Sequence, residues 1–191
     1  METPLWDRTT ISAIRQLDDP AGHSHIVSML DPEWPEPDQF DAWPADCRIV
    51  IRFHDEIAPR EQRLLPDRAM VEELLQFGQT MVGAKSDPSR LFIHCQSGMS
   101  RSTAGALILW AQAHPDTPAE RYFAMLARVR PIAWPNTLML AIADELLERR
   151  ESLARAAIPF LRGRLAEDPE LEARMIKLRR APDIEAIATL G

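Results

Sequence analysis

The residues best suited to chemistry lie in one short run, from His94 to Ser102 (His-Cys-Gln-Ser-Gly-Met-Ser-Arg-Ser). Cys95 carries a thiol that becomes a nucleophile when it is ionised, and Arg101 carries a planar guanidinium that can hold two oxygens of one anion. Gly98, between them, allows backbone conformations that other residues resist, so successive N–H groups can point into one concavity. This arrangement is typical of a site in which a cysteine attacks a bound tetrahedral oxyanion.

The elements on either side of this run must position it. Residues 91–94 predict a short apolar strand, and the apolar stretch from Thr103 to Ala113 predicts a buried helix. A helix N-terminus presents unpaired N–H groups and a partial positive charge, which together attract anions. The same field lowers the pKa of a thiol from about 8.5, so we expect Cys95 to be a thiolate near neutral pH. We expect the Ser102 hydroxyl to hydrogen-bond the sulfur and help it leave in the second chemical step.

The run resembles the signature of the protein tyrosine phosphatase superfamily, which has the order His-Cys-x-x-Gly-x-x-Arg-Ser. Its second half, Gly-Met-Ser-Arg-Ser, is similar to the dual-specificity branch. Residues 53–55 (Phe-His-Asp) end a predicted strand, where the family has its acid loop. Residues 130–136 (Arg-Pro-Ile-Ala-Trp-Pro-Asn) resemble the segment whose asparagine braces the phosphate loop. The resemblance covers about residues 20–150.

That resemblance implies a metal-free mechanism with no cofactor, because the loop and Arg101 supply the positive charge. Cys95 would attack phosphorus and form a phospho-cysteine intermediate while the loop holds the other oxygens. Asp55 would protonate the leaving oxygen and then act as a base toward water. The substrate-binding residues implied for the loop are Gln96, Ser97, Gly98, Met99, Ser100 and Arg101.

Three assignments around the loop are less direct. We expect His94 to support the loop through structural hydrogen bonds rather than to donate a proton. Asn136 would brace the phosphate loop, cap its own helix, or do both. The 40 residues between Asp55 and Cys95 are many for the compact branch. Asp67 therefore stays an alternative acid, although it more readily caps a helix predicted over 67–82.

The wider pattern predicts an α/β fold with a mostly parallel central sheet flanked by helices. Strands are expected over 25–30 and 48–53, besides the strand before the loop. Further helices are expected from a capping box at 117–120 to just before Pro131, and from near Asn136. We predict a phosphatase domain over 1–150 and a helical C-terminal extension over 151–191.

The extension is more charged than the domain before it, and Pro159 is expected to interrupt it. Asp168-Pro169-Glu170 is expected to open a helix with Leu171, Met175 and Leu178 on one face. Three roles are open for this segment: it packs on the core, joins a dimer, or is partly mobile.

Composition narrows the class of protein. A net charge of −7 disfavours nucleic acid as a partner, and no apolar run is long enough to span a membrane. Met1 is not followed by the basic and apolar regions of a secretory signal. The two cysteines, Cys47 and Cys95, fit a reducing cytoplasm, where we expect the protein to reside. Cys47 is expected to lie too far from Cys95 for a disulfide and to be a structural thiol.

The most direct interpretation is a protein tyrosine or dual-specificity phosphatase acting on a phosphorylated protein or peptide. Its loop has no lysine between Cys95 and Arg101, which favours a less charged phosphomonoester, such as phosphotyrosine, over a phosphoinositide or nucleotide. A sulfurtransferase also places a cysteine in an anion-binding loop, but it would have a shorter loop and would not require Asp55. An inactive phosphate-binding module is the last alternative. The oligomeric state stays open.

Overall fold

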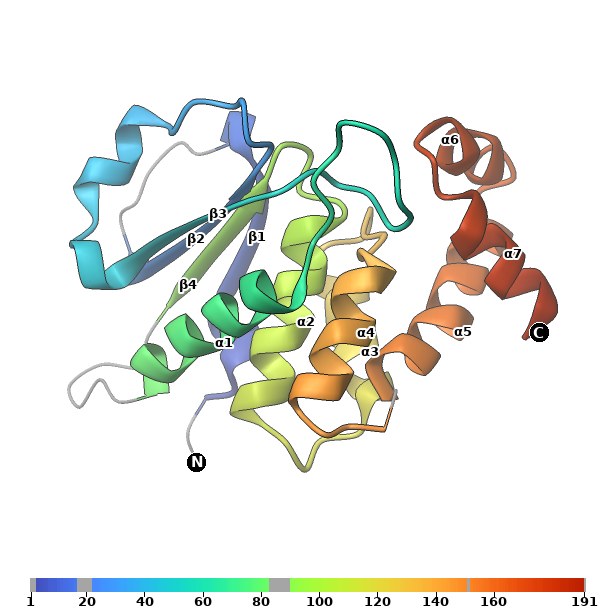
Figure 1. The fold of residues 1–191 in the computed structure, drawn as a ribbon. Coiled ribbons are helices and arrows are strands. Elements are labelled where there is room, and N and C mark those ends of the chain that lie inside the picture. The colour runs from blue at the N-terminus through green and yellow to red at the C-terminus, as the bar shows by residue number, and fades with distance from the viewer. Residues whose placement is uncertain (1–2, 17–21, 83–89, 151, 191) are drawn as a thin grey trace.

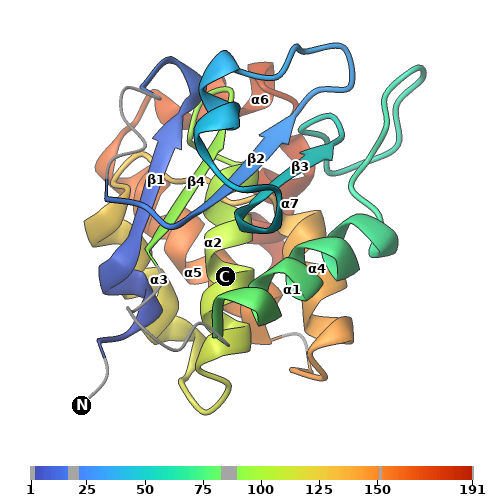
Figure 2. The same ribbon diagram turned by 90° about the vertical axis from the view of Figure 1, so that its left-hand side faces the viewer.

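Four parallel strands form one sheet, with the order β1-β4-β2-β3. The strands are β1 (Thr9–Ala13), β2 (His25–Leu30), β3 (Arg48–Arg52) and β4 (Leu91–Cys95). Figure 2 shows them side by side in this order. The structure is a computed structural model that describes residues 3–16, 22–82, 90–150 and 152–190. Because every strand runs the same way, the loops that follow β2, β3 and β4 meet at one edge of the sheet.

Seven α-helices accompany the sheet in the described residues: α1 (Arg68–Val82), α2 (Arg101–Ala113), α3 (Ala119–Val129), α4 (Thr137–Leu146), α5 (Ser152–Glu167), α6 (Leu171–Lys177) and α7 (Ala181–Thr189). Four short 3-10 helices complete the described elements: η1 (Leu5–Arg8), η2 (Ile14–Gln16), η3 (Asp38–Ala42) and η4 (Ala45–Cys47). The α/β class with a parallel sheet is confirmed. Among these helices, none is both long enough and apolar enough to cross a membrane.

Helix α2 is the centre of the fold. It packs on the sheet beside α1, while α3 and α4 pack against the side of α2 that faces away from the sheet (Figure 1). Every side chain from Arg101 to Ala111 is buried, because α2 is surrounded by the sheet and the other helices. Its apolar residues meet Val27, Met29 and Ile93 in the main core. The helix after the loop is therefore held rigidly, and so is the loop at its N-terminus.

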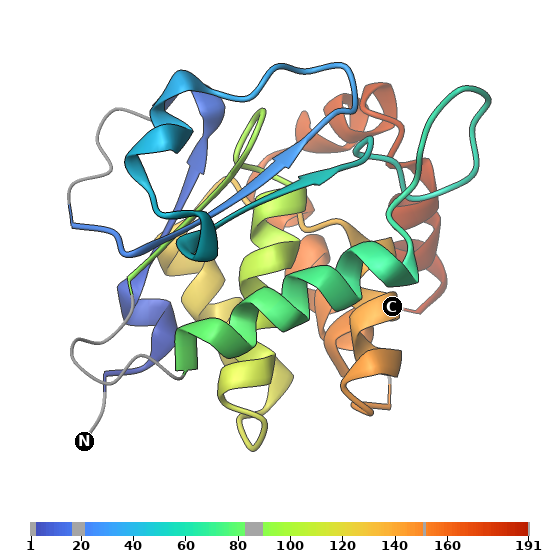
Figure 3. The same ribbon diagram turned by 60° about the vertical axis from the view of Figure 1, so that its left-hand side comes forward.

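The opposite face of the sheet is covered by the segment that contains η3 and η4 (Figure 3). Phe40 and Trp43 from this segment pack against Ile26 and Phe92 of the sheet in a second apolar cluster. Both faces of the sheet are thus buried, as the continuous apolar pattern of β2 and β4 requires.

The C-terminal extension packs on the core. Leu153, Ala156 and Ala157 of α5 belong to the main core, and α5 lies beside α3 and α4 (Figure 1). A third cluster joins Trp134 to Leu161, Leu171, Met175 and Ile187. Of the three roles that the sequence leaves open for this segment, packing on the core is the one described by the structure.

Several local predictions need correction. Strand β1 was not predicted, because Thr-Thr-Ile-Ser-Ala is a largely polar pattern for a strand. Helix α5 continues through Pro159, since burial of its flanking apolar residues offsets the lost hydrogen bond. The capping box at 117–120 does not form, because Pro118 occupies the N-cap position. Leu178 follows α6 and is 53% exposed, so it does not share the buried face of that helix.

Candidate active site

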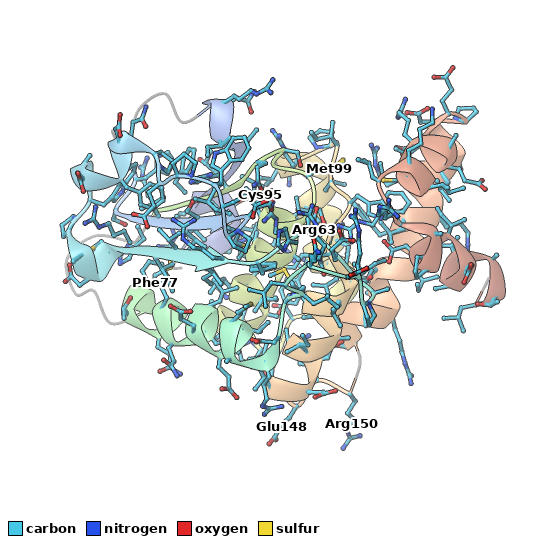
Figure 4. All side chains as sticks on the ribbon, turned by 45° about the horizontal axis from the view of Figure 1, so that its top comes forward. Arg63, Phe77, Cys95, Met99, Glu148 and Arg150 are labelled. Atoms are coloured by element: carbon cyan, nitrogen blue, oxygen red, sulfur yellow. The ribbon has the colours of Figure 1, made fainter. Side chains whose placement is uncertain are left out.

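Cys95 ends β4, and the loop after it leads directly into α2. Its sulfur lies 3.3 Å from the Gly98 nitrogen, which donates to it, and 3.3 Å from the Ser102 hydroxyl. The residue is 1% exposed, and Figure 4 labels it together with Met99, which belongs to the same loop. The structure therefore brings the predicted nucleophile, Ser102 and the start of α2 together, with two polar hydrogens available to stabilise negative charge on sulfur.

The loop can adopt this curvature only with glycine at position 98. Gly98 has φ +67°, and a Cβ there would lie 2.5 Å from the backbone carbon of Ser12 at the end of β1. Arg130 holds the outside of the loop, because its Nε donates to the Gly98 carbonyl at 2.8 Å and its Nη2 to the Ser97 carbonyl at 3.1 Å. With their carbonyls held from outside, the loop amides are free to face inward.

The guanidinium of Arg101 is fixed on one side only. Its Nη1 donates to the Phe53 carbonyl and lies 2.7 Å from the Asp31 carboxylate, which comes from the end of β2. The residue is 3% exposed, and its Nε has no hydrogen-bond partner among the described residues. A buried donor without a partner is costly, and an oxyanion in the loop is the natural acceptor for it.

Asp31 was not predicted as a site residue, and its role can be tested. Asp31→Asn removes the charge that orients Arg101, so we expect the affinity for vanadate to fall about tenfold. Isothermal titration with vanadate measures this. Asp41→Asn is the matched control, because Asp41 forms an ion pair with Arg48 and its side chain is 90% exposed. Equal vanadate affinity in Asp31→Asn and the unchanged protein would show that Asp31 does not orient Arg101.

Asp55 lies beside the loop and accepts three hydrogen bonds through one oxygen. The donors to its Oδ1 are the Ser100 hydroxyl at 2.8 Å, the Asn136 amide at 3.0 Å and the guanidinium of Arg180. Burial alone would raise the pKa of Asp55, but the charges of Arg180 and Arg101, with the hydrogen bonds from Asn136 and Arg180, lower it below its ordinary value. Asp55 is thus brought to the predicted place, and it is held as a carboxylate.

Asn136 has two structural roles. Its Oδ1 accepts from the Met139 nitrogen at 3.1 Å and caps α4. Its Nδ2 donates to Asp55 and to the Glu56 carbonyl at 3.2 Å, so the side chain braces the loop after β3 rather than the loop after Cys95. Only its backbone nitrogen reaches the loop after Cys95, at 3.4 Å from the Ser100 carbonyl. The capping prediction is confirmed, and the predicted brace acts on a different loop.

The long interval between Asp55 and Cys95 is explained by a closed loop. His54 and Leu64 form two hydrogen bonds of 2.8 Å that join the ends of the segment between them. Glu56 is buried inside this loop and pairs with Arg60 and Arg63. The extra residues therefore form a closed projection beside the site, and they leave Asp55 at its base.

Asp67 is a helix cap. Its Oδ1 accepts from the Met70 nitrogen at 2.9 Å at the start of α1, and the residue is exposed. This contact is the capping role that the sequence favours for Asp67. Cys47 is also remote, because it precedes β3 at the amino end of the sheet while Cys95 ends β4 at the carboxyl end. Both cysteines are free thiols.

His94 is fully buried between the rings of Phe40 and Phe92, whose centroids lie 5.8 Å and 6.1 Å from its own. Burial lowers the pKa of His94 to about 4, and the backbone of Cys95 opposes this only in part, so the ring is neutral at pH 7. Within the described part of the chain, neither ring nitrogen reaches hydrogen-bond geometry. His94 therefore supports the loop mainly by packing, and its polar contact with the backbone of Cys95 falls short of hydrogen-bond geometry.

The remaining loop side chains differ in where they lie. Met99 packs against the cluster around Trp134, and Ser97 is exposed. The hydroxyl of Ser100 belongs to the Asp55 network. Both amide atoms of Gln96 are buried without a hydrogen-bond partner in the described residues. The side chains between Cys95 and Arg101 are therefore uncharged, and Arg101 is the cation of the loop.

No protein-family model and no curated protein matches this sequence. Among solved structures, human DUSP28 is similar with a TM-score of 0.54 and 17% identity, over 75% of this chain and 94% of that chain. Yvh1 phosphatase domain from Chaetomium thermophilum has a TM-score of 0.46 and 18% identity, over 69% and 82% of the two chains. Tk-PTP in its active form has a TM-score of 0.47 and 22% identity, over 74% and 92%. At these identities the likeness concerns the fold, and it rests on the first structure.

Proposed function

We propose that this chain, which has the fold of the dual-specificity phosphatases, hydrolyses phosphomonoesters through a cysteine nucleophile. The observation that carries the proposal is the environment of Cys95. Its sulfur accepts from the Gly98 amide, inside the loop that leads from Cys95 to the N-terminus of helix α2. The buried Nε of Arg101, unpartnered among the described residues, supports it, because a phosphate oxygen would accept its proton.

In the first step, the sulfur of Cys95 forms a bond to phosphorus as the bond from phosphorus to the leaving oxygen breaks. The loop amides and Arg101 hold the other three oxygens while their charge redistributes. The leaving oxygen takes a proton from Asp55 where that carboxyl is protonated, and from solvent otherwise. The product of this step is a phospho-cysteine.

In the second step, water attacks the phospho-cysteine and the sulfur leaves as a thiolate. The carboxylate of Asp55 accepts a proton from that water. The Ser102 hydroxyl, 3.3 Å from the sulfur, stabilises the departing thiolate. The cycle needs Cys95 to be reduced, which agrees with the expected location in the cytoplasm.

The substrate class that fits best is an aryl phosphomonoester, as in a phosphotyrosine peptide. The loop interior offers one arginine and no lysine, so it gives no added attraction to a highly charged phosphoinositide headgroup. The proposal is tested with the purified chain on four substrates: a phosphotyrosine peptide, a phosphoserine peptide, an inositol phosphate and p-nitrophenyl phosphate. We expect the highest kcat/KM with the phosphotyrosine peptide. Absence of turnover on all four would overturn the proposed function.

Asp55→Asn tests the acid. Below about pH 5, where part of Asp55 is protonated, we expect kcat/KM for phenyl phosphate to fall about a hundredfold. The loss with p-nitrophenyl phosphate should be smaller, because its leaving oxygen needs less help from a proton. Steady-state kinetics on both substrates measure the difference. Asp67→Asn is the control, and the same leaving-group pattern in that variant instead would move the acid to Asp67.

A further inference from the structure

Arg180, in the C-terminal extension, lies in the candidate active site. It is 2% exposed, and its Nη2 donates to Oδ1 of Asp55 and to the hydroxyl of Ser100, the latter at 2.6 Å. Asp55 lies in the loop after β3, and Ser100 lies in the loop between Cys95 and α2. Arg180 comes from a third part of the chain and contacts both loops. A buried arginine that makes these two contacts is part of the site rather than of a solvated surface.

The turn between α6 and α7 places Arg180. The backbone nitrogen of Arg180 donates to the Met175 carbonyl at 2.9 Å, which closes α6 and sets the side chain at the start of α7. Asp183, one turn later, accepts from Trp134 Nε1 at 2.8 Å and from Thr137 Oγ1 at 2.6 Å. These contacts fasten α7 to the N-terminus of α4, so the position of Arg180 is fixed by its own helix.

The charges that face Asp55 come from three elements. Arg180 lies in the α6–α7 turn and Arg101 at the start of α2, and both favour the ionised carboxyl. Asp183, on α7, opposes them weakly, and burial raises its own pKa. Asp31 forms an ion pair with Arg101 and partly offsets the positive charge that Arg101 presents to Asp55. Arg180 is thus the cation that contacts Asp55 directly and has no carboxylate contact other than Asp55 among the described residues.

We propose that Arg180 is a positioning residue, by which the C-terminal extension holds Asp55 against the phosphate loop as a carboxylate. This rests on the proposed function of Cys95 and Asp55. With Asp55 ionised, the leaving oxygen of the first step takes its proton from solvent, and Asp55 acts as base toward water in the second step. At every pH above the lowered pKa of Asp55, the enzyme then favours leaving groups that depart without a proton. Tyrosine, whose phenol has a pKa of about 10, meets this condition far better than serine.

The test compares phenyl phosphate with p-nitrophenyl phosphate across pH. The ratio of their kcat/KM values, phenyl phosphate over p-nitrophenyl phosphate, reports proton donation by Asp55. The ionisation of the thiol and of the substrate changes both kcat/KM values and therefore largely cancels in the ratio. In the unchanged protein this ratio should fall as pH rises through the lowered pKa of Asp55. In Arg180→Met we expect the fall about one pH unit higher, and so a ratio about tenfold larger between the two midpoints.

Two further variants separate charge from structure. Arg180→Lys keeps a cation beside Asp55, so its ratio should follow the unchanged protein more closely than Arg180→Met does. Lys177→Met removes a charge from the exposed face of α6 and should leave the ratio unchanged. If the ratio for Arg180→Met superimposes on that of the unchanged protein, or if both substrates lose activity equally at every pH, Arg180 has only a structural role.

A direct titration keeps this proposal distinct from the proposed function. The carboxyl of Asp55, labelled with carbon-13 and assigned by its loss in Asp55→Asn, is followed by NMR in the full chain. A midpoint below the ordinary value of about 3.9 agrees with the role of Arg180, to which the charge of Arg101 adds, and a midpoint above it overturns that role. This measurement needs neither turnover nor a folded Arg180 variant. If the midpoint is low and the chain has no phosphatase activity, the proposed function is refuted while the effect of Arg180 on Asp55 is not.

Discussion

Cys95→Ser is expected to abolish hydrolysis of p-nitrophenyl phosphate and phosphotyrosine peptides. A serine hydroxyl is far less ionised than a thiol in the same field, so kcat should fall by at least about four orders of magnitude. The loop donors should keep their positions, because Arg130 holds the Gly98 carbonyl from outside the loop and the Phe53 carbonyl holds Arg101. Vanadate or tungstate should therefore still bind, with little change in affinity measured by isothermal titration.

Cys47→Ser is the matched control for this result. Cys47 lies at the opposite edge of the sheet and is partly exposed, so its replacement should leave kcat within about a factor of two. Turnover in Cys95→Ser near that of the unchanged protein would remove Cys95 as the nucleophile. Loss of both turnover and oxyanion binding, with an altered circular dichroism spectrum, would instead show that the loop had collapsed.

Arg101→Lys should cost nearly as much, although the charge is kept. Lysine presents one ammonium where arginine presents a planar fork, so it cannot hold Phe53 and Asp31 on one side and an oxyanion on the other. We expect kcat/KM to fall by about two to three orders of magnitude. The affinity for vanadate should fall as well, which separates this variant from Cys95→Ser.

Arg128→Lys controls for the same exchange at an exposed site on α3, and it should behave as the unchanged protein does. The melting temperature of both variants shows whether the fold is retained. If Arg101→Lys kept full vanadate affinity and full turnover, the guanidinium would have no part in binding phosphate, and the metal-free mechanism would lose its main cation.

The parts of the fold that the sequence predicts are those defined by local pattern. β2, β3 and β4 are runs of apolar and β-branched residues, and α1 and α2 have long apolar faces. β1 has no such pattern, because it is an edge strand that gains its regularity from pairing with β4. The path of α5 through Pro159 was also beyond a local rule, since tertiary packing outweighs the lost hydrogen bond there.

The candidate site also has a part that local sequence predicts and a part that depends on how distant segments pack. The run from Cys95 to Arg101 was recognisable because its residues lie close together in sequence at constrained spacing. Asp31 and Arg180 were not, because an arginine or an aspartate carries no sign of a partner that is remote in sequence; Arg180 and Asp55 are 125 residues apart. Asn136 could be predicted as a cap, which is local, but the loop that its amide braces depends on how two segments pack.

The site has a consequence for folding that follows from its location at the carboxyl edge of the sheet. Its walls come from the ends of β2, β3 and β4, from Arg130 and from the α6–α7 turn, so nearly the whole chain must close before all of them meet. Closing such long intervals costs chain entropy that only the complete core offsets. We therefore expect affinity for an oxyanion to be a property of the assembled topology, and a peptide containing the loop and α2 alone to lack it.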